Sequence, residues 1–363
     1  MTPDSASLEK NVRLFVWFRV LFNARFYYPI FAVFFTDMGL SVAQFLWLNV
    51  LWAVTIILFE LPSGVLADLI GRRKLVVFSA ASMLVEMLLL ILAPIGAGWW
   101  LFGVCAINRV LSGLAEAAAS GADEALAYDS VKLLHSDEKL RSEHWDRVLV
   151  STMRWRSVAM VVAMVVGAFV FDHQKMVSIF GDFPSWASLK LPVILCFFSA
   201  ITCVVISLKL KDLGLQQKPE GQRAKVSDVW QGVKGALNWV KTTKWIAAVI
   251  LGGVIIDSCA RTFITLQSSY FRFIDLPDYS YGLIGAGMSL SGWLVPLYVK
   301  QLVERWSPRV NLLIAGGIAL SGLGGVALFN NIYGILPCLL VMLSLMHVSF
   351  LLSRYINKAA PSE

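Results

Sequence analysis

Charged residues are scarce in this sequence. Asp, Glu, Lys and Arg make up 15% of the 363 residues, whereas hydrophobic residues make up 58%. Soluble globular domains carry about 25% charged residues on average. This composition, together with a mean hydropathy of +0.70, therefore excludes an ordinary soluble domain.

Residues suited to metal binding or redox chemistry are also few. The four histidines and five cysteines form no metal or redox spacing. All five cysteines lie in apolar runs, where we expect buried and inert thiols. No nucleophile–base pair and no phosphate-binding loop stands out, so we expect neither an enzyme nor a cofactor or metal.

The N-terminal residues 1–13 lack the basic region and small-residue cleavage site of a removable signal peptide. The first apolar run is therefore predicted to be a membrane-spanning helix. A bilayer core about 30 Å thick requires about 20 helical residues, and ten apolar segments reach that length. They are approximately 14–36, 42–66, 75–93, 99–126, 149–171, 190–208, 246–270, 281–303, 310–329 and 332–353. We predict an all-α polytopic membrane protein that resides in a lipid bilayer.

The distribution of lysine and arginine predicts the orientation of these segments. With the N-terminus inside, the cytoplasmic segments hold 24 of these cations, whereas the outer loops hold only Lys175, Lys190 and Arg272. Cytoplasmic loops of membrane proteins are enriched in Lys and Arg, so both termini are predicted to be cytoplasmic. Because the cations lie in loops, the net charge of +7 does not indicate nucleic-acid binding.

A charged motif lies between the second and third apolar segments and reads GVLADLIGRRK. Its marked positions are Gly64, Asp68, Gly71, Arg72, Arg73 and Lys74. Glycine permits a tight reversal, and the three cations mark the cytoplasmic side of the membrane. The motif resembles the signature loop between helices 2 and 3 of major facilitator superfamily transporters, and departs from it at Leu69, where the family usually has a cation.

The resemblance extends along most of the chain. Arg109 and Gly113 are similar to the second motif of that family, and the run Ser120 to Asp129 resembles a broad bacterial branch without a uniform substrate. The glycine-proline motif of drug antiporters is not evident. The resemblance implies a multi-pass protein of the bacterial inner membrane.

An internal repeat supports two related halves. A shift of 236 positions places Arg25 on Arg261 and Arg73 on Arg309, as expected for halves related by an axis along the membrane normal. In the same register, the counterparts of helices 5 and 6 are missing from the second half. We therefore expect a chain that lacks the last two helices of the family, one of which is thought to contact Asp68.

Three regions follow from this organisation. Residues 1–208 are predicted to form a six-helix bundle, and residues 246–363 an incomplete four-helix bundle. The central loop 209–245 is either an amphipathic helix on the inner leaflet, with Val229, Val233 and Leu237 on one side, or a solvated linker.

The resemblance implies that helices 1, 4, 7 and 10 line a central cavity. The polar residues that these helices supply are Asn23, Arg25, Arg109, Glu116, Asp257, Arg261 and His347. Two or three cations in a cavity would suit an anionic or zwitterionic small-molecule substrate, and Glu116 or Asp257 would be able to carry a coupling proton. Asp257 and Arg261 are also spaced i, i+4 and predicted to pair.

Each of these residues has an alternative interpretation. The buried charges, Glu86 in particular, would equally serve as structural ion pairs between helices, and His347 as a packing histidine. For the whole chain, the first hypothesis is a secondary transporter that works by alternating access. The alternative is a truncated, non-transporting remnant of the family, or a membrane protein that binds a partner.

Overall fold

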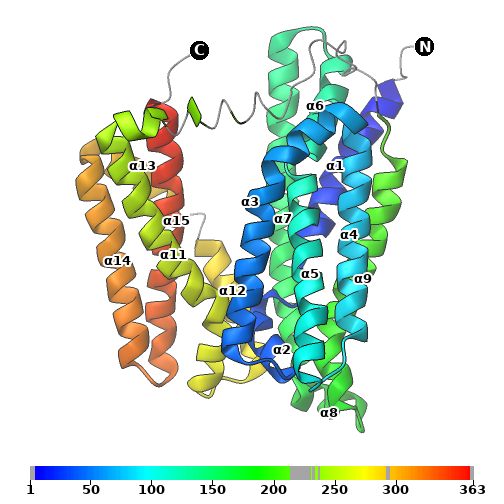
Figure 1. The fold of residues 1–363 in the computed structure, drawn as a ribbon, viewed down its shortest axis with the longest axis vertical. Coiled ribbons are helices and arrows are strands. Elements are labelled where there is room, and N and C mark those ends of the chain that lie inside the picture. The colour runs from blue at the N-terminus through cyan, green and yellow to red at the C-terminus, as the bar shows by residue number, and fades with distance from the viewer. Residues whose placement is uncertain (1–4, 213–229, 231–233, 236–237, 292–294, 360–363) are drawn as a thin grey trace. The chain divides into compact units, whose positions relative to one another are not determined.

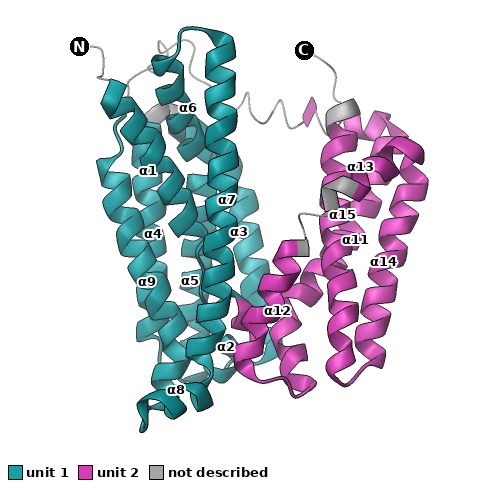
Figure 2. Cartoon of the chain, turned by 180° about the vertical axis from the view of Figure 1, so that it is seen from behind, with its two compact units in different colours: residues 1–28, 34–230 teal, residues 29–33, 231–363 magenta. Residues whose placement is uncertain are grey.

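The computed structural model describes residues 5–212, 230, 234–235, 238–291 and 295–359. The chain divides into two compact units, coloured separately in Figure 2. Unit 1 comprises Met1–Tyr28 and Phe34–Trp230, and unit 2 comprises Pro29–Val33 and Gln231–Glu363. The predicted amphipathic helix of the central loop falls mostly outside the described residues.

Helices and short turns make up both units (Figure 1). The first part of the chain forms α1 (Ser5–Asn23), η1 (Tyr28–Ile30), α2 (Phe31–Asp37), α3 (Val42–Ile70), α4 (Arg72–Leu92), α5 (Gly98–Ala119), α6 (Ala122–Leu134), α7 (Glu138–Phe171), α8 (His173–Phe180) and α9 (Ser185–Lys209). The second part forms α11 (Lys244–Phe273), α12 (Asp278–Ser291), α13 (Val295–Arg305), α14 (Pro308–Leu328), η3 (Ile332–Gly334) and α15 (Ile335–Ala359).

Eight segments within the described residues are long and apolar enough to cross a membrane. They coincide with eight of the ten predicted segments, which confirms the all-helical membrane fold. Of the other two, segment 14–36 differs from the prediction, because it is divided among α1, η1 and α2. Segment 281–303 includes residues 292–294, which lie outside the described part of the chain.

The interruption of segment 14–36 has a local cause. After Asn23 the i→i−4 hydrogen bonds stop, because Ala24 N donates to Leu21 O at 3.2 Å and Arg25 N donates to Asn23 O at 2.9 Å. Pro29 follows shortly afterwards, has no N–H to donate, and disfavours a helical backbone at Tyr28. The chain therefore continues as a 3₁₀ turn before α2 begins.

The predicted segment 99–126 coincides with the spanning stretch Gly98–Leu134, but it is not one continuous helix. Two helices, α5 and α6, replace it, and Gly121 lies between them with φ of 76°. A left-handed conformation of this kind suits glycine, and Gly121 lies two residues after Ala119, the last residue of α5. Asp123 and Glu124 consequently lie in the first turn of α6, where acidic side chains are stabilised by the helix dipole.

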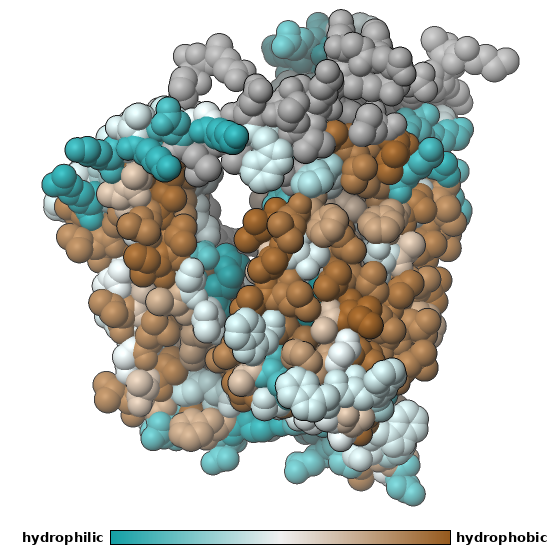
Figure 3. Space-filling model, viewed as in Figure 1, coloured by the Kyte–Doolittle hydropathy of each residue, from teal (hydrophilic) through white to brown (hydrophobic). Residues whose placement is uncertain are grey.

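Unit 1 packs around α4 and α1. Helix α4 contacts α5 and α9, α3 contacts α5, and α1 contacts α6, α7 and α9. Phe18, Met83 and Leu101 are fully buried in this interior, whereas Ile57 and Trp99 are mostly exposed. Exposed apolar side chains of this kind form the broad hydrophobic band visible in Figure 3, which is the surface expected to face lipid.

Unit 2 is built on α11, α14 and α15, which contact one another. Its core includes Val249, Val299, Ala315 and Leu351. The prediction that all five cysteines are buried is wrong for one of them. Cys259 of α11 is exposed, whereas the other four cysteines of the chain are buried.

Candidate functional site

A small polar cavity lies inside unit 1, between α1, α3 and α5. Its volume is about 140 Å³, enough for a few water molecules or a small polar group. The lining residues are Arg19, Phe22, Asn23, Ile56, Glu60, Glu116, Ala117, Ala119 and Ser120. Two of the residues predicted from the sequence, Asn23 and Glu116, are therefore brought together here.

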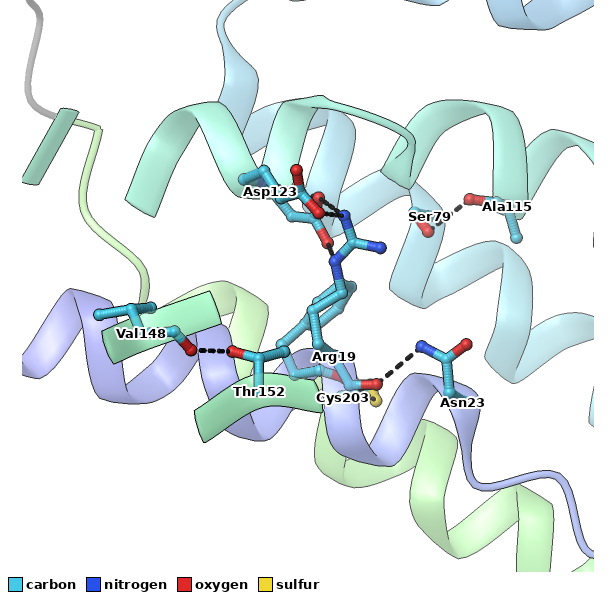
Figure 4. Close-up of polar contacts among 10 residues, drawn as sticks. Arg19, Asn23, Ser79, Ala115, Asp123, Val148, Thr152 and Cys203 are labelled. Carbon is cyan, nitrogen blue, oxygen red and sulfur yellow. Dashed lines mark hydrogen bonds and ion pairs between the residues drawn. The ribbon is translucent and has the colours of Figure 1, made fainter. Parts of the chain in front are cut away.

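Arg19 is the cation of this cavity, and two carboxylates neutralise it. Its Nη2 atom lies 2.9 Å from Asp123 Oδ1 and 2.7 Å from Glu124 Oε1 (Figure 4). The Asp123 side chain is almost completely buried, so this pair is shielded from solvent. The break between α5 and α6 places both acids opposite Arg19.

The two remaining charges of the cavity are carboxylates. Glu60 accepts a hydrogen bond from Ser120 Oγ at 3.3 Å, and Glu116 is exposed one helical turn before Ser120. Two carboxylates that line one cavity attract a cationic group. The lining thus has the chemistry of an ammonium site.

A second polar cluster is fully buried between α4, α5 and the segment that follows α1. Arg25 Nη1 lies 2.6 Å from Glu86 Oε1, and both side chains are nearly inaccessible to solvent. Asn108 donates to Glu86 O at 2.8 Å and accepts a hydrogen bond from Arg109 Nε at 3.1 Å. The guanidinium of Arg109 also lies 5.2 Å from the ring centroid of Phe35. Neither arginine lines the cavity described above.

The predicted residues of the second half lie in unit 2. Arg261 Nη2 and Nε donate to the two oxygens of Asp257 at 2.9 and 3.0 Å, which confirms the pair expected from the i, i+4 spacing. His347 on α15 is completely buried, and its ring packs edge-on against Tyr298 with centroids 5.7 Å apart.

The signature loop joins α3 directly to α4 through Gly71, which has φ of 97°. Arg72 Nη1 lies 2.6 Å from Asp129 Oδ2 of α6, and Arg73 Nη2 donates to Leu208 O of α9 at 2.8 Å. These contacts tie the turn to two other helices of unit 1. Gly64 and Lys74 are exposed on α3 and α4, and the side chain of Asp68 lies outside the described residues.

Sequence analysis did not assign Arg19, Glu60 and Ser120 to the site. A charge within an apolar run was the signal for the first two residues, since such charges line cavities or find partners. Ser120 precedes Gly121, a dipeptide typical of a turn. Among the described residues, no group of three or more His, Cys, Asp or Glu side chains could hold a metal ion.

Comparisons with known proteins agree with this architecture. The family model described as Major Facilitator Superfamily matches residues 14–363. The solved structure of the nucleoside transporter NupG is similar, with a TM-score of 0.72 at 12% identity over 98% of this chain and 83% of that one. A bacterial homologue of the iron transporter ferroportin, in an inward-facing state, has a TM-score of 0.66 at 18% identity over 98% and 85% of the two chains.

A bacterial homologue of the human lysosomal transporter Spinster, inward-facing and unoccupied, has a TM-score of 0.60 at 14% identity over 97% and 74% of the two chains. At such identities, these similarities show the fold alone. No curated protein matches the chain at a significant level.

Proposed function

Since the chain belongs to the Major Facilitator Superfamily and is a multi-pass membrane transporter, we propose that it moves a small solute across the bacterial inner membrane by alternating access. In this mechanism two halves rock around a site near the bilayer midplane. Both termini are proposed to be cytoplasmic, on the strength of the lysine and arginine distribution.

The cavity of unit 1 is the observation that carries the assignment of the site. It places Asn23, Glu60 and Glu116 around one small volume inside a bundle of apolar helices. Ionisable side chains are costly in such surroundings and usually mark substrate or proton pathways. We assign Glu116 as the group that takes up a coupling proton, because its carboxylate lines the cavity and has a second carboxylate nearby.

The ion pairs narrow the class of substrate. Arg19 lies 2.9 Å from Asp123 and 2.7 Å from Glu124. Arg25 lies 2.6 Å from Glu86, and Arg261 lies 2.9 Å from Asp257. These arginines are therefore neutralised, which weakens the argument for an anionic solute. A zwitterion fits better, since its ammonium group would bind between Glu60 and Glu116.

The other predicted residues have different proposed roles. Arg109, Asp257, Arg261 and His347 are proposed to contribute to binding or coupling as the solute passes from one side to the other. Arg25 is proposed to support the site indirectly, because its pairing with Glu86 fixes the segment that follows α1 against α4.

Ligand-induced thermal stabilisation of the purified chain tests this proposal. The panel would contain free amino acids, short peptides, primary amines, organic acids and sugars. We expect a zwitterion to raise the unfolding temperature of the wild type and Glu116→Gln to lose that shift. Glu143→Gln is the matched control, because Glu143 is exposed on α7 outside the cavity.

Uptake of the stabilising compound into proteoliposomes then tests transport. An imposed pH gradient should accelerate uptake by the wild type and by Glu143→Gln, but not by Glu116→Gln. Full stabilisation of Glu116→Gln by the compound would show that the cavity is wrongly assigned. Binding without uptake in any gradient would contradict the transport mechanism.

A further inference from the structure

Unit 2 contains a larger cavity, which the proposed transport mechanism does not use. It lies where α11 and α14 begin, and its volume is about 980 Å³. The lining includes Lys244, Trp245, Ala248, Ser307, Arg309 and Leu312. The membrane-spanning stretches Lys244–Phe273 and Pro308–Leu328 both start at this cavity, so it lies at the membrane–water interface.

The electrostatics of this cavity favour an anion. Lys244 and Arg309 are both exposed, and the described lining contains no Asp or Glu. Glu304, close to the end of α13, is engaged elsewhere because Arg354 Nη2 lies 3.2 Å from its Oε1 atom. The first turns of α11 and α14 add the partial positive charge of two helix dipoles.

Most of the remaining lining is apolar and continues into the membrane-facing surface. Trp245, Ala248 and Leu312 line the cavity itself. Leu313 and Leu320, further along α14, are 74% and 73% exposed. In Figure 3, hydrophilic residues gather at one end of unit 2 and hydrophobic residues cover the surface beyond it. A ligand with an anionic group and long apolar chains matches this arrangement, in which a cationic cavity is followed by an apolar surface.

We propose that this cavity binds an anionic phospholipid. Its phosphate lies between Lys244 and Arg309, where two cations and no carboxylate line the wall. The glycerol backbone packs against Trp245, a residue type enriched at membrane interfaces. The acyl chains follow Leu312 and the exposed leucines of α14, and this apolar continuation favours a lipid over free phosphate.

Native mass spectrometry of the purified full chain tests this site. Dioleoylphosphatidylglycerol, dioleoylphosphatidylcholine and inorganic phosphate are added separately to the protein in detergent. We expect the wild type to retain phosphatidylglycerol in preference to the other two. The double variant Lys244→Gln/Arg309→Gln should weaken that binding about thirtyfold, since each cation near a lipid surface contributes about a factor of five.

Two further variants distinguish the loss of lipid binding at this cavity from general effects of charge and of misfolding. Lys241→Gln removes a neighbouring exposed cation that does not line the cavity, and should leave binding unchanged. Lys244→Arg/Arg309→Lys keeps both charges and should retain binding, provided that it elutes as a single species in size exclusion.

Four results would overturn the proposal. These are equal retention of phosphatidylcholine, equally tight binding of inorganic phosphate, undiminished binding by the glutamine double variant, and no phosphatidylglycerol bound to the wild type. The last result is expected if a protein segment fills the cavity instead of a lipid.

Discussion

At the scale of single residues, the two arginines of the first apolar segment have distinct surroundings. Arg19 borders the cavity and is 20% exposed, whereas Arg25 is 4% exposed and faces Glu86, which is fully buried. An arginine without its carboxylate would leave an isolated charge in a medium of low dielectric constant. The Arg25–Glu86 pair should therefore matter for stability more than for solute binding.

Arg25→Ala should lower the free energy of unfolding by about 3–5 kcal/mol, because it leaves the Glu86 carboxylate buried and unpaired. Arg13→Ala is the matched control. Arg13 pairs with Glu9 at 3.8 Å on the surface, where both side chains are more than half exposed, and such pairs contribute at most about 1 kcal/mol. The thermal unfolding temperature of both variants in the same detergent measures the difference.

A double variant sharpens the interpretation of that result. Arg25→Met/Glu86→Leu removes both charges and should recover part of the lost stability, since apolar residues can replace a buried ion pair with little loss. Equal unfolding temperatures for Arg25→Ala and Arg13→Ala would contradict the role assigned to the buried pair.

At the scale of helices, the cavity depends on how closely α3 approaches α5. A Cβ atom added at Gly113 would lie 2.8 Å from the Cβ of Thr55 and 3.1 Å from Trp52 O. Gly113→Val should therefore push α3 away from α5, lower stability by about 1–3 kcal/mol, and weaken ligand-induced stabilisation. Gly103→Val is the control, because a Cβ at Gly103 of the same helix meets no atom within 4 Å.

Unfolding temperatures with and without ligand measure both effects for Gly113→Val and Gly103→Val. If the two variants behave alike, the loss at Gly113 reflects the helix propensity of valine rather than the contact between α3 and α5.

Most helices could be predicted from the sequence because apolar runs of about 20 residues are unambiguous in length and composition. The breaks could not. Averaged over about 20 residues, segments 14–36 and 99–126 remain apolar despite the polar residues at their interruptions, so hydropathy averaged in this way does not locate the breaks at Tyr28 and Gly121. Only the local chemistry of Pro29 and of the Ser120–Gly121 pair marks them.

The candidate site could be predicted in part. Asn23 and Glu116 were predicted because the family resemblance implies that helices 1 and 4 line a cavity, and these are polar residues of those helices. Their neighbours depend on contacts between helices distant in sequence. The pairing of Arg19 with Asp123, 104 residues apart, follows from the break after α5 and from the packing of α1 on α6. Neither the break after α5 nor the packing of α1 on α6 could be deduced from residue spacing along one helix.

At the scale of the whole molecule, transport requires a defined orientation in the membrane. Lys and Arg are concentrated in the segments predicted to be cytoplasmic, and this bias sets the topology of membrane proteins. Under the proposed proton coupling, the side of the membrane on which each loop lies also determines the direction from which Glu116 receives a proton.

Phosphatase fusions measure this orientation directly. A phosphatase that is active only in the periplasm should be inactive when fused after Lys358. It should be highly active when inserted near Lys175, in the connection between α7 and α9 that contains α8. Fusion at Ser136, in the turn between α6 and α7 beside a group of predicted cytoplasmic cations, serves as an internal negative control. An active fusion at Lys358 together with an inactive one at Lys175 would reverse the topology. The proton would then reach Glu116 from the opposite side, and the internal repeat inferred from Arg25 and Arg261 would lose its support.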